Sequence, residues 1–181
     1  STGVNIDSGV GSVEIYGKST DSYGVNLALG TSTGINIKSA KTTGTAITLD
    51  GWSSASYGLV FNFDVNKQIL ATGGGDISLK GVATTADYGI FIQGIDILAS
   101  SGKITLDGGT RGITKGGNLA SNIGSVTGDS NIASSNSNID IIGDNLNIAS
   151  SVSIQTSGEL SLLSSGNSFA SSVSTSNFDI K

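Results

Sequence analysis

The sequence predicts an all-β protein, a parallel β-solenoid with three short strands in each coil. Three observations support this prediction: apolar and polar residues alternate in many short segments, these segments recur at regular spacing, and Gly, Ser, Asn and Asp fill the intervals. Alternation with a period of two indicates strands with one buried face, and the residues between them are those that turns require.

The clearest repeat is a five-residue strand that ends in Gly. Its copies start at Val13, Ile47, Ile77 and Ile104, so they are 34, 30 and 27 residues apart. A second strand follows in the first three units and begins with Tyr-Gly; a third strand closes each unit, with a poorer match in the second. The second strands are 23–27, 57–61 and 88–92, and the third strands are 35–37, 65–70 and 95–97. One such unit cannot bury its apolar face alone, so stacking is predicted.

The repeat continues with shorter coils towards the C-terminus. We expect one domain over residues 1–181, with a coil period, counted in residues, of about 27–34 in 1–118 and of about 18–21 in 119–181. The later strands are expected at 139–141, 146–148, 152–154, 160–162 and 178–180. Where alternation is weak, the inward candidates are Ile113, Leu119, Ile123, Val126 and Ile132. We expect seven or eight coils, hence a rod of about 35 Å at about 4.8 Å per coil.

Composition restricts the chemistry. Gly, Ser, Thr and Asn supply 89 of the 181 residues, while Cys, His, Met and Pro are absent. Disulfides, thiolate nucleophiles and Cys- or His-based metal sites are therefore excluded. Nine dispersed basic residues and a net charge of -5 argue against nucleic-acid binding. No apolar run approaches the roughly 20 residues that span a bilayer, so we expect no membrane insertion. Without a signal peptide or initiator Met, we expect a processed product or an excised piece.

The Tyr-Gly pairs are the most regular feature of the repeats. Stacked coils would bring Tyr23, Tyr57 and Tyr88 into one ladder. Tyr23 has the parity of the inward residues Val25 and Leu27, which favours a structural ladder over an aromatic platform for sugar rings. The glycine after each tyrosine then has a backbone role, either a positive φ or a tight bend.

The residue before the turn glycine is charged in three successive coils. Asp50, Lys80 and Asp107 would stack as a charge ladder that fixes the register of the strands. A catalytic role for the two aspartates is the alternative. Two coils would hold them roughly 10 Å apart, which exceeds the spacing of about 5 to 9.5 Å between paired glycosidase carboxylates.

Three apolar residues are candidates for a contact surface. Trp52 lies in a turn, and Val60 and Phe91 have outward parity on equivalent strands. Exposed apolar groups can mark such a surface, and packing under a longer loop is the alternative. The segment 73–77 (Gly-Gly-Gly-Asp-Ile) is similar to a calcium-binding nonapeptide, but that motif requires tandem copies. We expect no cofactor, with calcium in this turn as the alternative to an ordinary turn.

Taken together, these motifs resemble the repeat region of filamentous-haemagglutinin-like large adhesins, which Gram-negative bacteria export by the two-partner (type Vb) route. The matching segments are 44–51 (GTAITLDG), 74–81 (GGDISLKG) and 102–108 (GKITLDG), with the Tyr-Gly strands and Asn-Leu-Asn-Ile at 145–148. The resemblance covers residues 3–110 well and 137–181 more loosely. It implies a right-handed parallel β-helix stalk that is exported unfolded and folds outside the cell.

The function that follows is structural. We expect a non-enzymatic stalk segment of a secreted or cell-surface bacterial adhesin that mediates adhesion, aggregation or biofilm formation. Its partners would be a host-cell or matrix receptor or polysaccharide, an outer-membrane transporter during secretion, and other copies through end-to-end association. The alternative is a carbohydrate-binding or carbohydrate-cleaving β-helix, similar to a phage tailspike or a lyase.

Overall fold

The computed structural model describes residues 4–27, 34–62, 67–85, 88–115, 121–125, 138–147, 152–166 and 168. These residues form strands, apart from turns and one 3₁₀ turn, η1 (Gly109–Arg111). The strands are β1 (Val4–Asp7), β2 (Val13–Ser19), β3 (Val25–Asn26), β4 (Ile35–Ser39), β5 (Thr45–Ser53), β6 (Leu59–Asn62), β7 (Gln68–Ala71), β8 (Asp76–Ala83), β9 (Ile90–Gln93), β10 (Asp96–Ala99), β11 (Ile104–Asp107), β12 (Ile113–Lys115), β13 (Ser121–Ser125), β14 (Ile139–Ile142), β15 (Leu146–Asn147), β16 (Val152–Gln155) and β17 (Leu160–Leu163).

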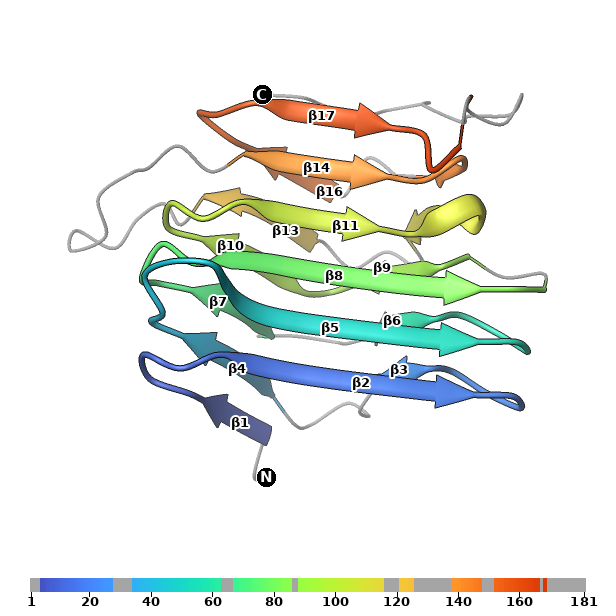
Figure 1. Ribbon diagram of the computed structural model, residues 1–181, viewed down its shortest axis with the longest axis horizontal. Helices are drawn as coiled ribbons and strands as arrows, with labels where there is room; N and C mark the ends of the chain where they lie inside the picture. Colours follow the sequence, from blue (N-terminus) through green and yellow to red (C-terminus); the bar gives the residue numbers. More distant parts are fainter. Residues whose placement is uncertain are drawn as a thin grey trace.

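Every third strand belongs to the same parallel sheet. Sheet A has the order β1-β4-β7-β10-β13-β16, sheet B has β2-β5-β8-β11-β14-β17, and sheet C has β3-β6-β9-β12-β15. In Figure 1 the strands of sheet B run from left to right in front, and the chain returns behind them while it climbs from the N-terminus to the C-terminus. This path is a right-handed winding. The predicted all-β parallel solenoid with three strands per coil is confirmed.

The register of sheet B agrees with the repeats read from the sequence. Val13 pairs with Ile47, Ile47 with Ile77, and Ile77 with Ile104, as the alignment of the repeats predicts. Ile104 then pairs with Ile139, and Ile139 with Leu160, so the longest step of the sheet is followed by the shortest.

The expected seven or eight coils are too many for the described residues, which contribute six strands each to sheets A and B and five to sheet C. The long step from Ile104 to Ile139 accounts for part of the difference, and the coil expected at 178–180 lies outside the described residues. Because alternation is weak between 111 and 137, the sequence predicts two short coils where sheet B makes one long step.

The core is a set of aliphatic columns that run along the solenoid axis. Ile37, Leu49, Leu79, Ile97 and Leu106 are at most 1% exposed, and their register partners in neighbouring coils are also aliphatic. Burial of each such side chain contributes about 1.5–3 kcal/mol. Of the inward candidates in the weak region, Ile113 and Ile123 are buried. The other three, Leu119, Val126 and Ile132, and the expected strand 178–180 lie outside the described residues.

Sheets B and C meet backbone to backbone at a corner made by glycines. A Cβ atom on Gly51 would lie 2.0 Å from the carbonyl oxygen of Gly58 in the same coil. The pairs Gly17–Gly24, Gly81–Gly89 and Gly108–Gly112 repeat this close approach in other coils. Gly24, Gly58 and Gly89 do not have positive φ angles, so of the two expected backbone roles the tight approach is the one found.

A small apolar cavity lies inside the C-terminal half of the core. Its lining includes Ile92, Leu106, Ile113, Ile141 and Val152. Because the space would hold about one water molecule at most and the wall is aliphatic, we expect it to be dry. In the part of the chain that the structure describes, no helix is long and apolar enough to cross a membrane.

Candidate contact surface

Serine side chains shape the turns that carry the aromatic residues from sheet B to sheet C. At the end of β2 the Ser19 hydroxyl accepts hydrogen bonds from the N–H groups of Asp21 and Ser22, at 3.3 and 3.0 Å. One coil later, Ser53 accepts from the N–H groups of Ala55 and Ser56 in the same way, at 3.1 and 2.8 Å. Such side-chain bonds to the local backbone favour a turn over continuation of the strand. They place the following tyrosines at equivalent positions in adjacent coils.

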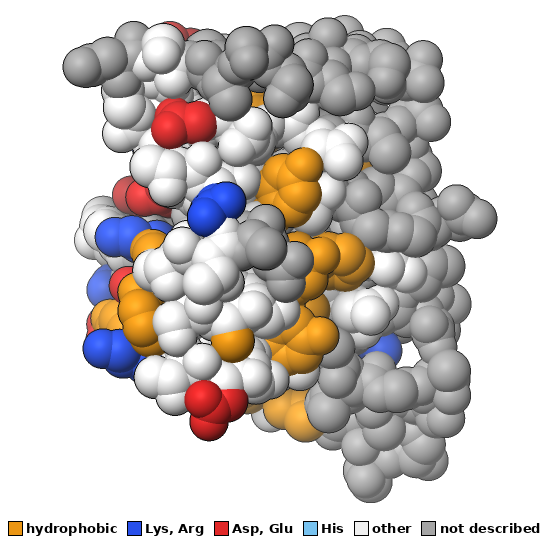
Figure 2. All heavy atoms as spheres, turned by 90° about the vertical axis from the view of Figure 1, so that its right-hand side faces the viewer, with side chains coloured by type: hydrophobic (Ala, Val, Ile, Leu, Met, Phe, Trp, Pro, Cys, Tyr) orange, Lys and Arg blue, Asp and Glu red, His pale blue; other side chains and the backbone are white. Residues whose placement is uncertain are grey.

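The turns before Tyr23 and Tyr57, together with strand β9, which carries Phe91, bring three aromatic rings together on one side of the solenoid. Tyr23 stacks on Tyr57 with ring centroids 6.1 Å apart, and Phe91 meets Tyr57 edge to face at 5.0 Å. Both geometries are favourable for aromatic pairs and contribute about 0.5–1.5 kcal/mol each. Figure 2 shows apolar side chains gathered along this side of the molecule, in a run that crosses several coils. We call Tyr23, Tyr57 and Phe91 the aromatic ladder.

The ring that meets Tyr57 from the third coil is that of Phe91, three residues after Tyr88. Tyr88 is partly exposed, and Tyr57 contacts the rings of Tyr23 and Phe91. The expectation that Tyr23 points inward is wrong, because its side chain is 38% exposed. The reason is that the close approach at Gly24 bends the chain before β3 begins, so the strand parity of Val25 does not extend back to the tyrosine.

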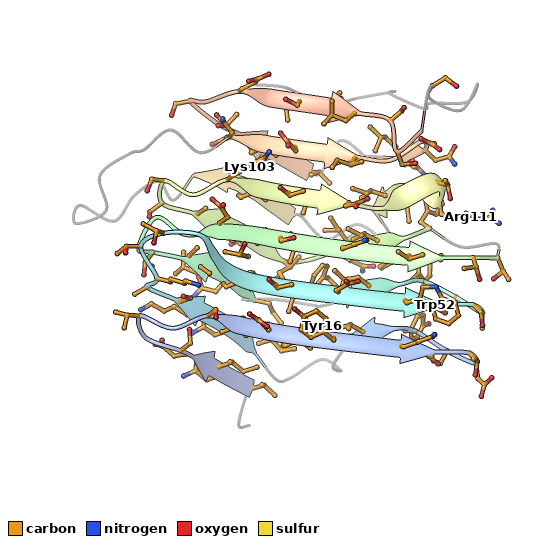
Figure 3. The ribbon with its side chains drawn as sticks, viewed as in Figure 1. Tyr16, Trp52, Lys103 and Arg111 are labelled. Atoms are coloured by element: carbon orange, nitrogen blue, oxygen red, sulfur yellow. The ribbon has the colours of Figure 1, made fainter. Side chains whose placement is uncertain are left out.

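Trp52 lies near the end of β5, and its backbone closely approaches Gly24, the residue after Tyr23. It pairs in register with Lys18 of β2 and Val82 of β8, and it is partly exposed. The Lys18 ammonium lies 4.6 Å from the centroid of the indole ring, a cation–π contact worth about 0.5–1 kcal/mol at an exposed site. Figure 3 shows Trp52 near the end of the strand where sheet B turns towards sheet C.

Val60 is not available as a contact residue. It has the expected outward parity and pairs with Phe91 in register, but it is 4% exposed. Phe91 beside it is only partly exposed, since its ring packs against Tyr57. The prediction that Val60 forms part of an exposed apolar surface is therefore wrong. Trp52 and the aromatic ladder remain as the partly exposed apolar groups on this side.

The predicted charge ladder is in register. Asp50 pairs with Lys80, and Lys80 pairs with Asp107, on the outer face of sheet B. Within the described residues no ion pair joins Lys80 to either aspartate. The Asp107 carboxylate accepts the N–H of Gly109 at 2.9 Å instead, which stabilises the turn into η1. Asp50 and Asp107 are two coils apart, so they do not form a close carboxylate pair.

Tyr16 precedes Asp50 in the same column and is 65% exposed. Its hydroxyl donates a hydrogen bond to Glu14 at 3.3 Å. The negative charge of Glu14 is the main reason that the pKa of Tyr16 is raised above its ordinary value, with smaller contributions from partial desolvation, this hydrogen bond and Asp50. Tyr16 lies on the front of the solenoid (Figure 3), on the same outer face of sheet B as Lys18, the register partner of Trp52.

Other charged side chains form contacts between neighbouring coils. Lys103 forms an ion pair with Asp140, one coil further on. Asp76, in the glycine-rich segment, accepts the N–H of Lys103 at 2.8 Å. No group of three or more acidic side chains with the spacing of a metal site occurs among the residues that the structure describes.

The sequence located the tyrosine turns but missed the association of Phe91 with Tyr57. The available signal was the outward parity of Phe91, one coil beyond Tyr57.

Comparisons of the chain with protein-family models, with curated proteins and with solved structures found no match.

Proposed function

We propose that this chain is a shaft segment of a secreted or cell-surface bacterial adhesin, where it acts as a spacer and contributes a lateral contact surface. The observation that carries the proposal is the parallel stacking of all three sheets over the described residues, where β5 and β8 show one register shift, between Thr45 and Ile47. The absence of Cys and the resemblance of the repeats to adhesin shafts add support.

A solenoid of this kind suits a spacer because each coil contacts only its neighbours. Backbone hydrogen bonds run along the axis from coil to coil, and the aliphatic columns run in the same direction. Each bond contributes only about 1 kcal/mol net, but the coils support one another and length can grow by addition of further coils. The solenoid can therefore become longer without a wider hydrophobic core.

The same geometry predicts how the spacer responds to load. A force applied between the two ends acts along the interstrand hydrogen bonds, so coils should detach one after another. Each of the longer coils should release roughly 90–115 Å of chain, at about 3.4 Å per residue. Single-molecule force spectroscopy would measure these steps. Extension at negligible force, without steps of coil length, would contradict the spacer proposal.

A carbohydrate-binding β-helix is the second candidate, and the aromatic ladder with Trp52 favours it. Tyrosine, phenylalanine and tryptophan side chains supply large apolar surface, and the Lys18 ammonium lies over the ring of Trp52. However, Tyr23 and Tyr57 stack on each other, which leaves less ring face for a sugar. Polysaccharide contact is therefore proposed as an addition to the spacer role.

Glycan-array binding and a reducing-sugar release assay separate the two candidates. We expect no turnover, and binding that Trp52→Ala and Phe91→Ala weaken together. Val10→Ala is the control, since it removes an exposed apolar side chain from the turn before β2, at the end of that strand opposite to Lys18. Sugar release that Asp50→Asn or Asp107→Asn abolishes would overturn the spacer proposal in favour of an enzyme.

A further inference from the structure

Two tyrosine rings of adjacent coils are stacked within the aromatic ladder. Tyr23 and Tyr57 have ring centroids 6.1 Å apart and ring planes inclined by only 22°. The N–H of Gly24 donates a hydrogen bond to the carbonyl oxygen of Tyr57 at 3.2 Å, and β3 pairs with β6 from Val25 onwards. The two side chains therefore leave equivalent positions of parallel coils, so their rings are neighbours along the solenoid axis.

Both rings of this pair can be reached from solvent. The Tyr23 side chain is 38% exposed, and Tyr57 is partly exposed. Phe91 packs edge to face on Tyr57 at 5.0 Å and carries no hydroxyl, so Tyr23 is the phenol that lies next to Tyr57. Exposed side chains change rotamer within nanoseconds, which allows the Tyr23 ring to move closer to its partner.

The other two of the four tyrosines have no such neighbour. Tyr16 is 65% exposed on sheet B, and its hydroxyl is bonded to Glu14. Tyr88 is partly exposed. In the part of the chain that the structure describes, which includes all four tyrosines, neither of these rings stacks on another tyrosine. Positions 23 and 57 are therefore where two phenols of one chain are held together.

The composition removes the residues that most often react with oxidants. Cys and Met are both absent, so no thiol or thioether consumes a peroxide, and no disulfide can join one coil to the next. Besides the tyrosines, Trp52 is the remaining ring that is readily oxidised. A covalent bond between coils would therefore have to come from other side chains, and the stacked phenols are placed to supply it.

We infer that Tyr23 and Tyr57 form an oxidative cross-linking site that joins two adjacent coils as a dityrosine. The co-reactant is hydrogen peroxide used by a haem peroxidase, which takes one electron from each phenol while each hydroxyl proton goes to solvent. The two radicals couple through a new bond between one Cε carbon of each ring. The hydrogen on each of these carbons then moves to the phenol oxygen, which restores both aromatic rings.

The reaction balances with one molecule of peroxide. One carbon–carbon bond forms, two ring carbon–hydrogen bonds and the peroxide oxygen–oxygen bond break, and the two hydrogen atoms lost by the protein convert the peroxide into two molecules of water. The inference concerns the side-chain geometry of the aromatic ladder and does not depend on the adhesin proposal.

Proximity decides which product forms and what it does. Because the partner ring is held beside each radical, coupling within the chain is effectively unimolecular and should be faster than coupling between molecules in dilute solution. The bond closes a loop of chain from position 23 to position 57, which is one full coil. As with a disulfide, closure of such a loop restricts the unfolded chain and should raise the melting temperature by roughly 5–15 °C.

The test oxidises the purified chain in dilute solution with a haem peroxidase and a limiting amount of hydrogen peroxide. Dityrosine fluorescence and intact mass detect the product, and size-exclusion chromatography separates monomers from linked chains. Trypsin cleavage after Lys places the four tyrosines in separate peptides, so mapping identifies the joined pair; these peptides are 1–18, 19–38, 42–67 and 81–103.

Four single variants test the position of the bond. Tyr23→Phe and Tyr57→Phe each keep the ring but lack the hydroxyl that radical formation requires. The matched controls, Tyr16→Phe and Tyr88→Phe, each remove one hydroxyl from a tyrosine outside the pair. Circular dichroism establishes that each variant is folded, and melting before and after oxidation measures the effect of the bond.

The inference predicts one product with one dependence on sequence. The unmodified chain and both controls should give a monomer lighter by two hydrogen atoms, with peptides 19–38 and 42–67 joined, and a raised melting temperature. Tyr23→Phe and Tyr57→Phe should each abolish this product. A cross-link within the chain that persists in either variant, or dityrosine found only between molecules, would overturn the inference. So would peroxidase treatment that oxidises Tyr16 without joining the two peptides, or a joined product that melts no higher than the untreated chain.

Discussion

Replacing Leu79 by Asp is the most severe test of which side chains of the strands point into the core and which point to solvent. Leu79 is 0% exposed and lies between Leu49 and Leu106 in its column. Its neighbour Ser78 has the opposite parity and is partly exposed on the outer face of the same strand. The pair Leu79→Asp and Ser78→Asp therefore adds the same carboxyl to adjacent residues on opposite faces of β8.

The expected difference in stability is large. Loss of the buried leucine costs about 2–3 kcal/mol, and an unpaired charge in the core costs several kcal/mol more. Together these losses are a large fraction of the roughly 5–15 kcal/mol that stabilises a typical domain. Ser78→Asp should change the stability by less than about 0.5 kcal/mol, as most surface substitutions do.

Thermal melting followed by circular dichroism measures the difference, and its pH dependence adds a second check. Burial raises the pKa of the introduced carboxyl above its unfolded value of about 3.9. The folded state thus favours the protonated form, so Leu79→Asp should be least destabilising below about pH 3.9 and more destabilising as the pH rises above it. Equal melting temperatures for the two variants would refute the assignment of faces.

Three further predictions address the corner, the surface and the cavity. Gly51→Ala should destabilise the fold strongly, because its Cβ would lie 2.0 Å from the Gly58 oxygen, and denaturant unfolding would measure the loss. The pKa of Tyr16 should lie above that of an ordinary tyrosine because of Glu14, and Glu14→Gln should lower it in an ultraviolet absorbance titration. Val152→Ile should fill part of the apolar cavity and raise the unfolding free energy by up to about 0.8 kcal/mol, measured by the same denaturant unfolding.

Each of these predictions has its own control. Gly166→Ala is the control for the corner, since a Cβ there meets no heavy atom within 4 Å. An equal loss for both glycine variants would contradict the close-packing argument. A Tyr16 titration that does not respond to Glu14→Gln would remove the proposed electrostatic cause. A lower stability for Val152→Ile would mean that the cavity has the wrong shape for the added methylene.

Much of the fold could be predicted because period-two alternation and the repeat spacing are local signals. Val13, Ile47, Ile77 and Ile104 could be aligned by eye, and the structure pairs them in that register. The coil count failed after Ile104 because the next step, to Ile139, is the longest in the sheet and has little alternation to mark its strands. A repeat period can be read only where each copy keeps its own strand pattern.

The contact surface was predicted less well because parity holds only within a strand. Tyr23 lies before β3, where a close approach of glycines bends the chain, so counting back from Val25 gave the wrong face. Val60 did have the predicted parity, but exposure depends on what packs over the sheet. Such packing involves residues from separate coils, and a local pattern does not contain it.

Distances along one outward column test the stacked parallel coils most directly. Glu14, Thr105, Asp140 and Ser161 share a column of sheet B, and the native chain has no Cys to interfere with spin labelling. Labels at position 14 and at 105, 140 or 161 should be separated by about 14, 19 and 24 Å, an increase of about 4.8 Å per coil. Pulsed electron paramagnetic resonance distances that do not increase in equal steps along this series would contradict the solenoid.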